Sequence, residues 1–175
     1  MIEIRLHGRG GQGVKKASMI LGRTGYMAGY KTQDFAMYGA ERKGAPVTSF
    51  VRIDKKAINT RGHIFHPDYI VILDDTLDIP CNITGAKPTT QIIINSAKKF
   101  PNLKNVHVVD ATSIVMKETG KNITNVAMLG ALAKISKIFS IKNIENAVKV
   151  ELGKYNPDML AKNMKAAKEI YNQTK

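Results

Sequence analysis

The sequence predicts an α/β protein, built as a single three-layer α/β/α domain over residues 1–175 with a mostly parallel or mixed sheet. Short apolar runs alternate with helix-like segments over the first two-thirds of the chain, and helical patterns close it. The first apolar run leads through a glycine-rich loop into a helix, which predicts a Rossmann-like first β–α unit. No internal repeat, low-complexity segment or linker interrupts the 175 residues, a length that supports one sizeable core.

The expected elements follow from local patterns. Runs of apolar residues, or apolar residues that alternate with polar ones, predict strands at 2–6, 47–53, 69–73, 91–94 and 106–109, with a short polar strand at 31–37. Helical spacing of apolar residues predicts helices at 14–28, 112–119, 124–139, 141–152 and 158–171. The helix at 124–139 is apolar almost throughout and should be buried, with Thr124 and Asn125 as its cap.

The first loop is the most informative motif. Residues 7–13 read His-Gly-Arg-Gly-Gly-Gln-Gly, and Gly8, Gly10 and Gly13 match the G-x-G-x-x-G spacing. Such a loop brings backbone N–H groups and a helix N-terminus close to phosphate oxygens, although the same pattern also occurs as a tight turn without a ligand. A nicotinamide site needs an acid after a second buried strand, whereas Asp34 follows a polar segment.

A second loop, at 38–46, reads Tyr-Gly-Ala-Glu-Arg-Lys-Gly-Ala-Pro. If the sheet is parallel, it lies at the same edge as the glycine loop, together with the loops at 73–78 and 110–113. Arg42, Lys43 and Arg9 would then converge on one anion; the alternative is an exposed charged turn. The acidic pair Asp74 and Asp75 is interpreted as turn and cap residues rather than as a metal site.

The charge of the chain is strongly basic, with a formal net charge of +13 and a pI of about 9.8. All the arginines lie within the first 61 residues, which marks that part as the working surface because the guanidinium fork holds phosphate or carboxylate with defined geometry. Nucleic acid is a weaker hypothesis, since aromatic residues make up 6% of the chain and do not alternate with basic ones.

Other classes of function lack the necessary residues. The lone Cys81 cannot form an internal disulfide, an iron–sulfur site or a zinc site, and the four histidines have no metal-ligand spacing. No Ser-His-Asp or Cys-His arrangement is recognisable, and neither a membrane span nor a signal peptide is expected. We therefore expect a cytoplasmic chain that has no catalytic residue and no metal site of its own.

Together the two loops resemble the gamma subunit of 2-oxoacid:ferredoxin oxidoreductases. The similarity lies in residues 7–25 and 35–54 and continues through Ile58, Arg61, Ile64, 67–68 and 128–132; it covers about residues 1–150. Residues 41–46 resemble the pyruvate and branched-chain types, because the 2-oxoglutarate type tends to have Gly-Gly after the arginine. Pyruvate is therefore favoured. Family members often have two arginines where this chain has Arg42 and Lys43, which keeps the charge but loses one fork.

The resemblance implies a complex that converts pyruvate, coenzyme A and oxidised ferredoxin reversibly to acetyl-CoA, carbon dioxide and reduced ferredoxin. In this family, thiamine diphosphate with magnesium is held by the alpha and beta subunits and iron–sulfur clusters by the beta and delta subunits. The gamma subunit helps to bind coenzyme A and brings neither group. The expected binding residues are Arg9, Gly10, Gly11, Gln12, Gly13, Arg42 and Lys43: the loop backbone would contact the pyrophosphate, Arg42 and Lys43 would neutralise phosphates, and Arg9 would assist.

Two other hypotheses stay open. The chain could be purely a scaffold in the same complex or in a branched-chain 2-oxoacid complex, with both loops serving as interfaces. A more distant alternative is a free-standing basic protein that binds nucleic acid. The sequence does not determine the 2-oxoacid, the direction of the reaction or the stoichiometry of the complex.

Overall fold

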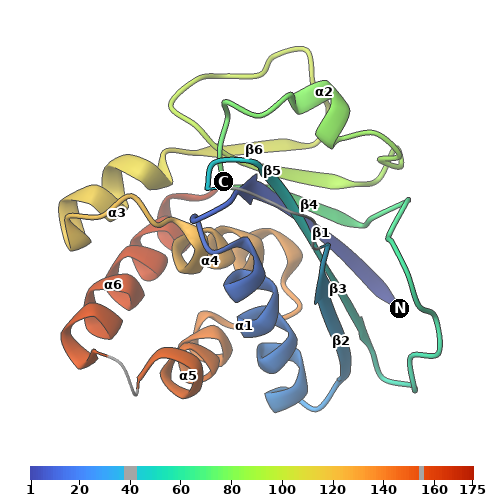
Figure 1. Ribbon diagram of the computed structural model, residues 1–175, viewed down its shortest axis with the longest axis horizontal. Helices are drawn as coiled ribbons and strands as arrows, with labels where there is room; N and C mark the ends of the chain where they lie inside the picture. Colours follow the sequence, from blue (N-terminus) through green and yellow to red (C-terminus); the bar gives the residue numbers. More distant parts are fainter. Residues whose placement is uncertain (38–42, 154–155) are drawn as a thin grey trace.

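The computed structural model describes residues 1–37, 43–153 and 156–175. Its centre is a six-stranded sheet in the order β2-β3-β1-β4-β5-β6 (Figure 1). The strands are β1 (Ile2–Arg9), β2 (Lys31–Ala36), β3 (Pro46–Asp54), β4 (Tyr69–Ile72), β5 (Gln91–Asn95) and β6 (Val106–Val109). Strands β1, β4, β5 and β6 run parallel, whereas β3 is antiparallel to both β1 and β2. The carboxyl ends of β1, β2, β4, β5 and β6 therefore share one edge of the sheet.

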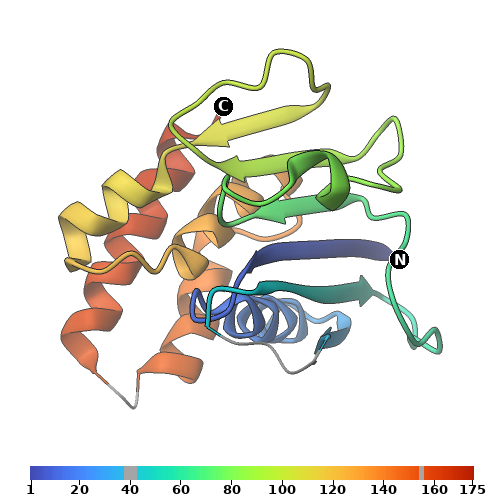
Figure 2. The same cartoon turned by 45° about the horizontal axis from the view of Figure 1, so that its top comes forward.

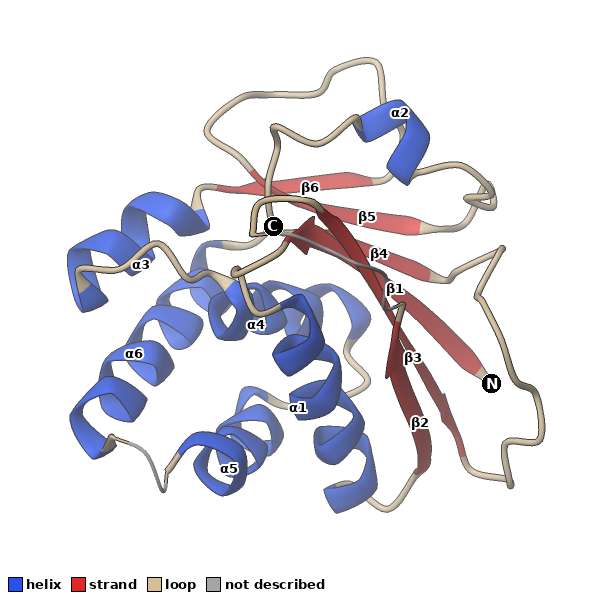
Figure 3. Ribbon diagram, viewed as in Figure 1, coloured by secondary structure: helices blue, strands red, loops and turns tan. Residues whose placement is uncertain are grey.

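The helices are distributed unequally over the two faces of this sheet. They are α1 (Val14–Met27), α2 (Ile79–Asn82), α3 (Ala111–Thr119), α4 (Asn125–Ser136), α5 (Ile141–Leu152) and α6 (Pro157–Gln173). All but α2 lie on one face, as the blue helices of Figure 3 show. On the other face, Figure 2 shows the short α2 in front of β4 and β5. No helix in the described part of the chain is long and apolar enough to cross a membrane.

Alternation along the strands explains the two cores. Ile4 and Leu6 of β1, with Val71 and Ile93 on the neighbouring strands, point to the helices and are fully buried in the main core. α4 lies in the middle of that layer and is buried almost all round, as its apolar sequence predicts. A smaller core fills the opposite face under α2; its buried members are Ile70, Ile72, Leu77, Ile79, Ile92 and Ile94. That core covers β4 and β5 but not β2 and β3.

Comparison with the expected elements confirms the α/β class with a mostly parallel sheet, and the predicted strands and long helices are all present. Three features differ. The strand β3 is antiparallel to β1, and α2 carried no periodic signal because it has only four residues. Helix α4 ends at Ser136 rather than at 139, because Lys137 adopts a left-handed conformation with φ 54° that stops the helix.

Candidate functional site

The glycine loop lies at the carboxyl edge of the sheet. β1 continues to Arg9, the chain turns through residues 10–13, and α1 begins at Val14. Gly11 and Gly13 have φ values of 95° and 76°, which residues with a Cβ rarely adopt. Their backbone N–H groups have no acceptor among the described residues. The loop thus presents free donors at the positive end of a helix, the arrangement that binds anions.

Arg9 connects the glycine loop with the turns that contain Gly44 and Thr76. Its guanidinium donates to the carbonyl of Thr76 at 2.9 Å and to that of Gly44 at 3.1 Å, and Nε lies 3.4 Å from the Asp74 carboxylate. Gln12 donates to Asp74 at 2.6 Å and accepts the Arg9 backbone N–H at 2.7 Å. Burial alone would raise the pKa of Asp74, but the hydrogen bonds from Thr76 and Gln12 and the charge of Arg9 hold that pKa below its usual value. Asp74 is therefore ionised, and its carboxylate links Gln12, Thr76 and Arg9.

The second loop meets the glycine loop, as expected for its described part. The Gly10 N–H donates to the Ala45 carbonyl at 2.8 Å, and the Gly44 N–H donates to the Gly10 carbonyl at 3.0 Å. The Lys43 side chain lies next to Gly11, since a Cβ added to Gly11 would lie 3.7 Å from Lys43 Cγ. Arg42 lies in 38–42, outside the described residues. Of the predicted basic residues, Arg9 and Lys43 are brought to the glycine loop.

A cavity of about 190 Å³ opens beside these groups. It is lined by Arg9, Gly10, Gly11, Gly13, Val14, Lys15, Ala36, Met37 and Val47. Pockets that enclose a drug-sized ligand are usually about 300–1,000 Å³. The cavity therefore has room for a part of a large ligand, with backbone donors on one side and apolar groups on the other.

Asn125 is a site residue that the sequence did not reveal. It was expected to cap α4, but Thr124 occupies the N-cap position without a side-chain cap bond. The Asn125 amide instead donates to the carbonyl of Gly13 at 3.2 Å, and its oxygen accepts the N–H of Val126 at 2.8 Å. The helix that is most deeply buried thereby holds the end of the glycine loop. The two residues are 112 positions apart, so no local pattern could have predicted this contact.

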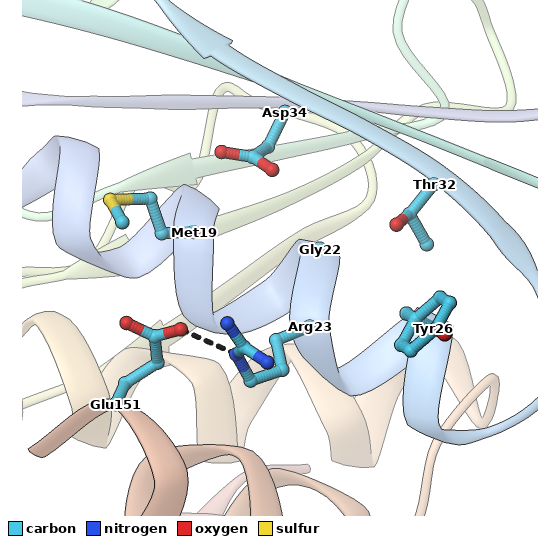
Figure 4. A pocket seen from close by; sticks show the side chains of 7 residues that line it. All are labelled: Met19, Gly22, Arg23, Tyr26, Thr32, Asp34 and Glu151. Carbon is cyan, nitrogen blue, oxygen red and sulfur yellow. Dashed lines mark hydrogen bonds and ion pairs between the residues drawn. The ribbon is translucent and has the colours of Figure 1, made fainter.

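Asp34 does not face the glycine loop. It lies on the edge strand β2 and points at Gly22 on α1, in a hollow of about 270 Å³ that also contains Arg23 and Glu151 (Figure 4). Gly22 is eight residues beyond the start of α1, which corresponds to about 12 Å of helix. Burial and the charge of Glu151 raise the pKa of Asp34. The carboxylate is too far from the loop to hold a ribose whose phosphates are bound there.

The remaining acids of this edge serve turns and caps. The carboxylate of Asp75 accepts the Ser96 hydroxyl at 2.6 Å, and that of Asp110 accepts the Ser113 N–H at 2.9 Å and caps α3. A polar cavity of about 410 Å³ lies between them, next to Gln12. Within the described ranges, no three His, Cys, Asp or Glu side chains form a potential metal site.

The chain thus combines an α/β sheet with a glycine-rich loop at the N-terminus of its first helix, and Lys43 lies next to that loop. The chain belongs to the pyruvate ferredoxin/flavodoxin oxidoreductase family, whose model matches residues 3–173. It is 39% identical over 183 residues to the pyruvate/ketoisovalerate oxidoreductases common subunit gamma of Pyrococcus furiosus, with 99% of this chain and 97% of that protein covered. It is 40% identical over 175 residues to pyruvate synthase subunit PorC of Methanocaldococcus jannaschii, with the same coverage.

Solved structures agree with this family assignment. The crystal structure of the pyruvate oxidoreductase subunit PORC from Thermotoga maritima matches 99% of this chain and 97% of its own, with 34% identity and a TM-score of 0.87. The 2-oxoglutarate:ferredoxin oxidoreductase from Magnetococcus marinus, solved with 2-oxoglutarate, coenzyme A and succinyl-CoA bound, has the same fold in 31% of a longer chain. Its TM-score is 0.80 at 20% identity, so this likeness concerns the fold alone.

Proposed function

We propose that this chain is the gamma subunit of a pyruvate:ferredoxin oxidoreductase complex and that it binds and orients part of coenzyme A. The observation that supports this role most is the glycine loop: the N–H groups of Gly11 and Gly13 have no acceptor among the described residues, and Lys43 lies next to Gly11. Coenzyme A carries a pyrophosphate and a 3′-phosphate, so backbone donors and an ammonium group suit it chemically. The cavity of about 190 Å³ would take only the pyrophosphate region.

Each of the predicted binding residues has a specific task in this proposal. Gly10, Gly11, Gln12 and Gly13 form the loop. The N–H groups of Gly11 and Gly13 contact the pyrophosphate, whereas those of Gly10 and Gln12 donate to carbonyls and fix the shape of the loop. Lys43 neutralises the charge of the pyrophosphate, as does Arg42. Arg9 acts mainly by position, because its guanidinium already bonds to Thr76 and Gly44 and pairs with Asp74. These groups hold a reactant in place and break no bond themselves, so their contribution is one of orientation.

The chemistry of the reaction belongs to other subunits in this proposal. Thiamine diphosphate with magnesium and the iron–sulfur clusters would be held by the alpha, beta and delta subunits, and ferredoxin would be reached through the complex. The free Cys81 of this chain is exposed and alone, and it cannot ligate a cluster. Relatives described as common to pyruvate and ketoisovalerate oxidoreductases make a branched-chain 2-oxoacid complex the second candidate.

The test is Lys43→Ala in the assembled complex. Because Lys43 lies next to the loop and contributes positive charge there, we expect the KM for coenzyme A to rise about tenfold, while the KM for pyruvate changes little. Steady-state kinetics with each substrate varied in turn would measure both constants. Lys31→Ala is the matched control, since Lys31 is an exposed lysine at the opposite end of β2 and its loss changes the net charge equally.

Equal effects of Lys43→Ala on both substrates, or effects equal to those of Lys31→Ala, would contradict coenzyme A binding at this loop. In that case a purely structural role of the chain in the complex would fit the kinetics better than coenzyme A binding. Binding of nucleic acid that disappears at moderate salt would be non-specific and would not support the basic-protein alternative.

A further inference from the structure

One half-face of the sheet has no helix over it in the described part of the chain. The helices cover one side of all six strands, and α2 with its core covers β4 and β5 on the other side. On that second side, Arg5, Phe50 and Phe35 pair in register across β1, β3 and β2, and Arg52 of β3 lies between Glu3 and Gln33 in the next row. In the described chain, residues 63–65 pack on this face, and the backbone at 82–84 accepts hydrogen bonds from Arg5.

A stack of aromatic rings runs over this face. The rings of Phe35 and Phe50 are stacked with centroids 4.8 Å apart, Phe50 stacks on His63 at 5.5 Å, and His63 contacts Phe65 at 6.0 Å. Phe65 ends the stack with 68% of its surface exposed, and Met37 beside it is 43% exposed. Large apolar side chains left in water beside a cavity are typical of a protein contact surface.

The cavity at this stack has a buried cation in its wall. It measures about 180 Å³ and is lined by Arg5, His7, Met37, Thr48, Phe50, His63, Ile64 and Phe65. Arg5 is 9% exposed, and its guanidinium donates to the carbonyls of Asn82 at 2.8 Å and Thr84 at 2.9 Å. No acid pairs with it in the described ranges, and Arg5 Nε and His7 Nε2 have no hydrogen-bond partner there.

An unpaired buried charge is unfavourable, and an anion placed nearby offsets part of that cost. The residues at the rim of the face are positively charged, as Arg5 is. The segment 55–68 contains Lys55, Lys56 and Arg61, and its one acid, Asp68, pairs with Lys87. Arg61 donates to backbone carbonyls and not to a carboxylate. The face is therefore apolar in the middle, with positive charges at its rim and the buried guanidinium of Arg5 beneath it.

We propose that this face, formed by Phe35, Phe50, His63, Phe65 and Met37 over Arg5, docks an acidic segment of a partner subunit, which inserts a carboxylate side chain into the cavity. The inference rests on the proposed function insofar as it assumes a complex with other subunits. It concerns the side of the sheet away from the helices, whereas the glycine loop lies at the carboxyl edge. Met37 lines both cavities, whereas Phe50, His63 and Phe65 line only the cavity of the docking face.

The test compares Phe65→Glu with Phe65→Lys. Both variants remove the ring and add one charge at an exposed position, so both should fold with the melting temperature of the unaltered chain. The dissociation constant of each full-length variant for the complex of the other subunits would be measured by surface-immobilised binding. We expect Phe65→Glu to bind at least about tenfold more weakly than Phe65→Lys, because a carboxylate repels an acidic partner.

Tyr26 provides the matched control. It is an equally exposed aromatic residue, at 69%, but it lies on α1 in the helix layer. Tyr26→Glu and Tyr26→Lys should bind alike. If they differ as much as the Phe65 pair, or if the Phe65 pair binds alike while the unaltered chain assembles, the docking surface is wrong. If the unaltered chain does not bind the other subunits at all, it is the proposed function that fails.

The identity of the occupant has its own readout. A photoreactive phenylalanine analogue placed at position 65 of the assembled complex would be cross-linked and the joined peptide identified by mass spectrometry. A peptide of another subunit that contains Asp or Glu supports the proposal. A peptide from a second copy of this chain, or one without an acidic residue, overturns it.

Discussion

Gly13 and Asn125 form the contact on which the shape of the glycine loop depends. Gly13 has a left-handed backbone with φ 76° and lies where the loop becomes α1. A Cβ on this residue would overlap the amide nitrogen of Asn125, which donates to the Gly13 carbonyl. Glycine is therefore required here twice, once by the backbone conformation and once by the helix packed against it.

Gly13→Ala should lower the free energy of unfolding for two separable reasons. The left-handed conformation costs alanine about 1–2 kcal/mol, and overlap with Asn125 adds about 1–3 kcal/mol. In an Asn125→Ala background the second contribution disappears, so the same substitution should be distinctly less destabilising there. Urea denaturation of the two single variants and the double variant measures this difference. An equal loss in both backgrounds would show that Asn125 does not limit the space.

At the scale of elements, α4 and α6 pack with their backbones in close approach. The crossing is at Gly130, where an added Cβ would overlap the carbonyl oxygen of Ala167 and lie 3.1 Å from its carbonyl carbon. Both residues are buried, and neighbouring alanines on the two helices are fully buried as well. Small residues on both helices thus set the distance between α4 and α6 in the helix layer.

Gly130→Ala should destabilise the fold although alanine favours helices. The obstacle is backbone rather than a flexible side chain, so α6 must shift, at a cost of about 1–3 kcal/mol or more. Gly120→Ala is the control. Gly120 ends α3 in a left-handed conformation with open space around it, so the substitution should lower the free energy of unfolding by only about 1–2 kcal/mol. Thermal unfolding of both variants compares them. A Gly130→Ala protein as stable as the original would mean that α4 and α6 are not held at this distance.

At the scale of the whole molecule, the two faces of the sheet differ in the kind of side chain that they bury. The helix-covered face buries an almost wholly apolar core, whereas the other face buries Arg5, Arg52 and His7. Arg52 is fully buried but satisfied, because it pairs with Glu3 at 2.9 Å and donates to Gln33 at 2.9 Å. For His7, burial and then the charge of Arg5 lower the pKa from 6.5 to about 3, and a hydrogen bond with Asn82 offsets only part of that shift.

This burial predicts a loss of stability in mild acid. Between pH 6.5 and about 3 the unfolded chain binds a proton on His7 that the folded chain excludes, so lowering the pH favours unfolding. From pH 7 to pH 5.5 the free energy of unfolding should fall by about 1 kcal/mol on account of His7. Urea titrations at both pH values measure the change. In His7→Gln the difference between the two pH values should shrink by that amount, whatever the variant's own stability; an unchanged difference would show that His7 titrates normally.

Local patterns in the sequence determined most of the strands and helices and the position of the glycine loop. The apolar runs at 69–73 and 106–109 became β4 and β6, the helical spacing at 141–152 became α5, and the glycine loop was placed between β1 and α1. These features were predictable because they depend on neighbours within a few residues: alternation, helical period and turn residues. The same local motifs carried the resemblance to the family that the comparisons confirmed.

The tertiary structure alone decided the contacts between distant segments. Three such contacts are the antiparallel pairing of β1 with β3, the hydrogen bond of Arg9 to Thr76 at a separation of 67 positions, and that of Asn125 to Gly13 at 112 positions. No periodicity records such pairs, because they arise from how layers pack and from which buried polar groups find partners. The same holds for the half-face without a helix over it and for the buried Arg5, which has no acidic partner among the described residues. A sequence shows that a residue is charged, and only packing shows whether its charge is compensated.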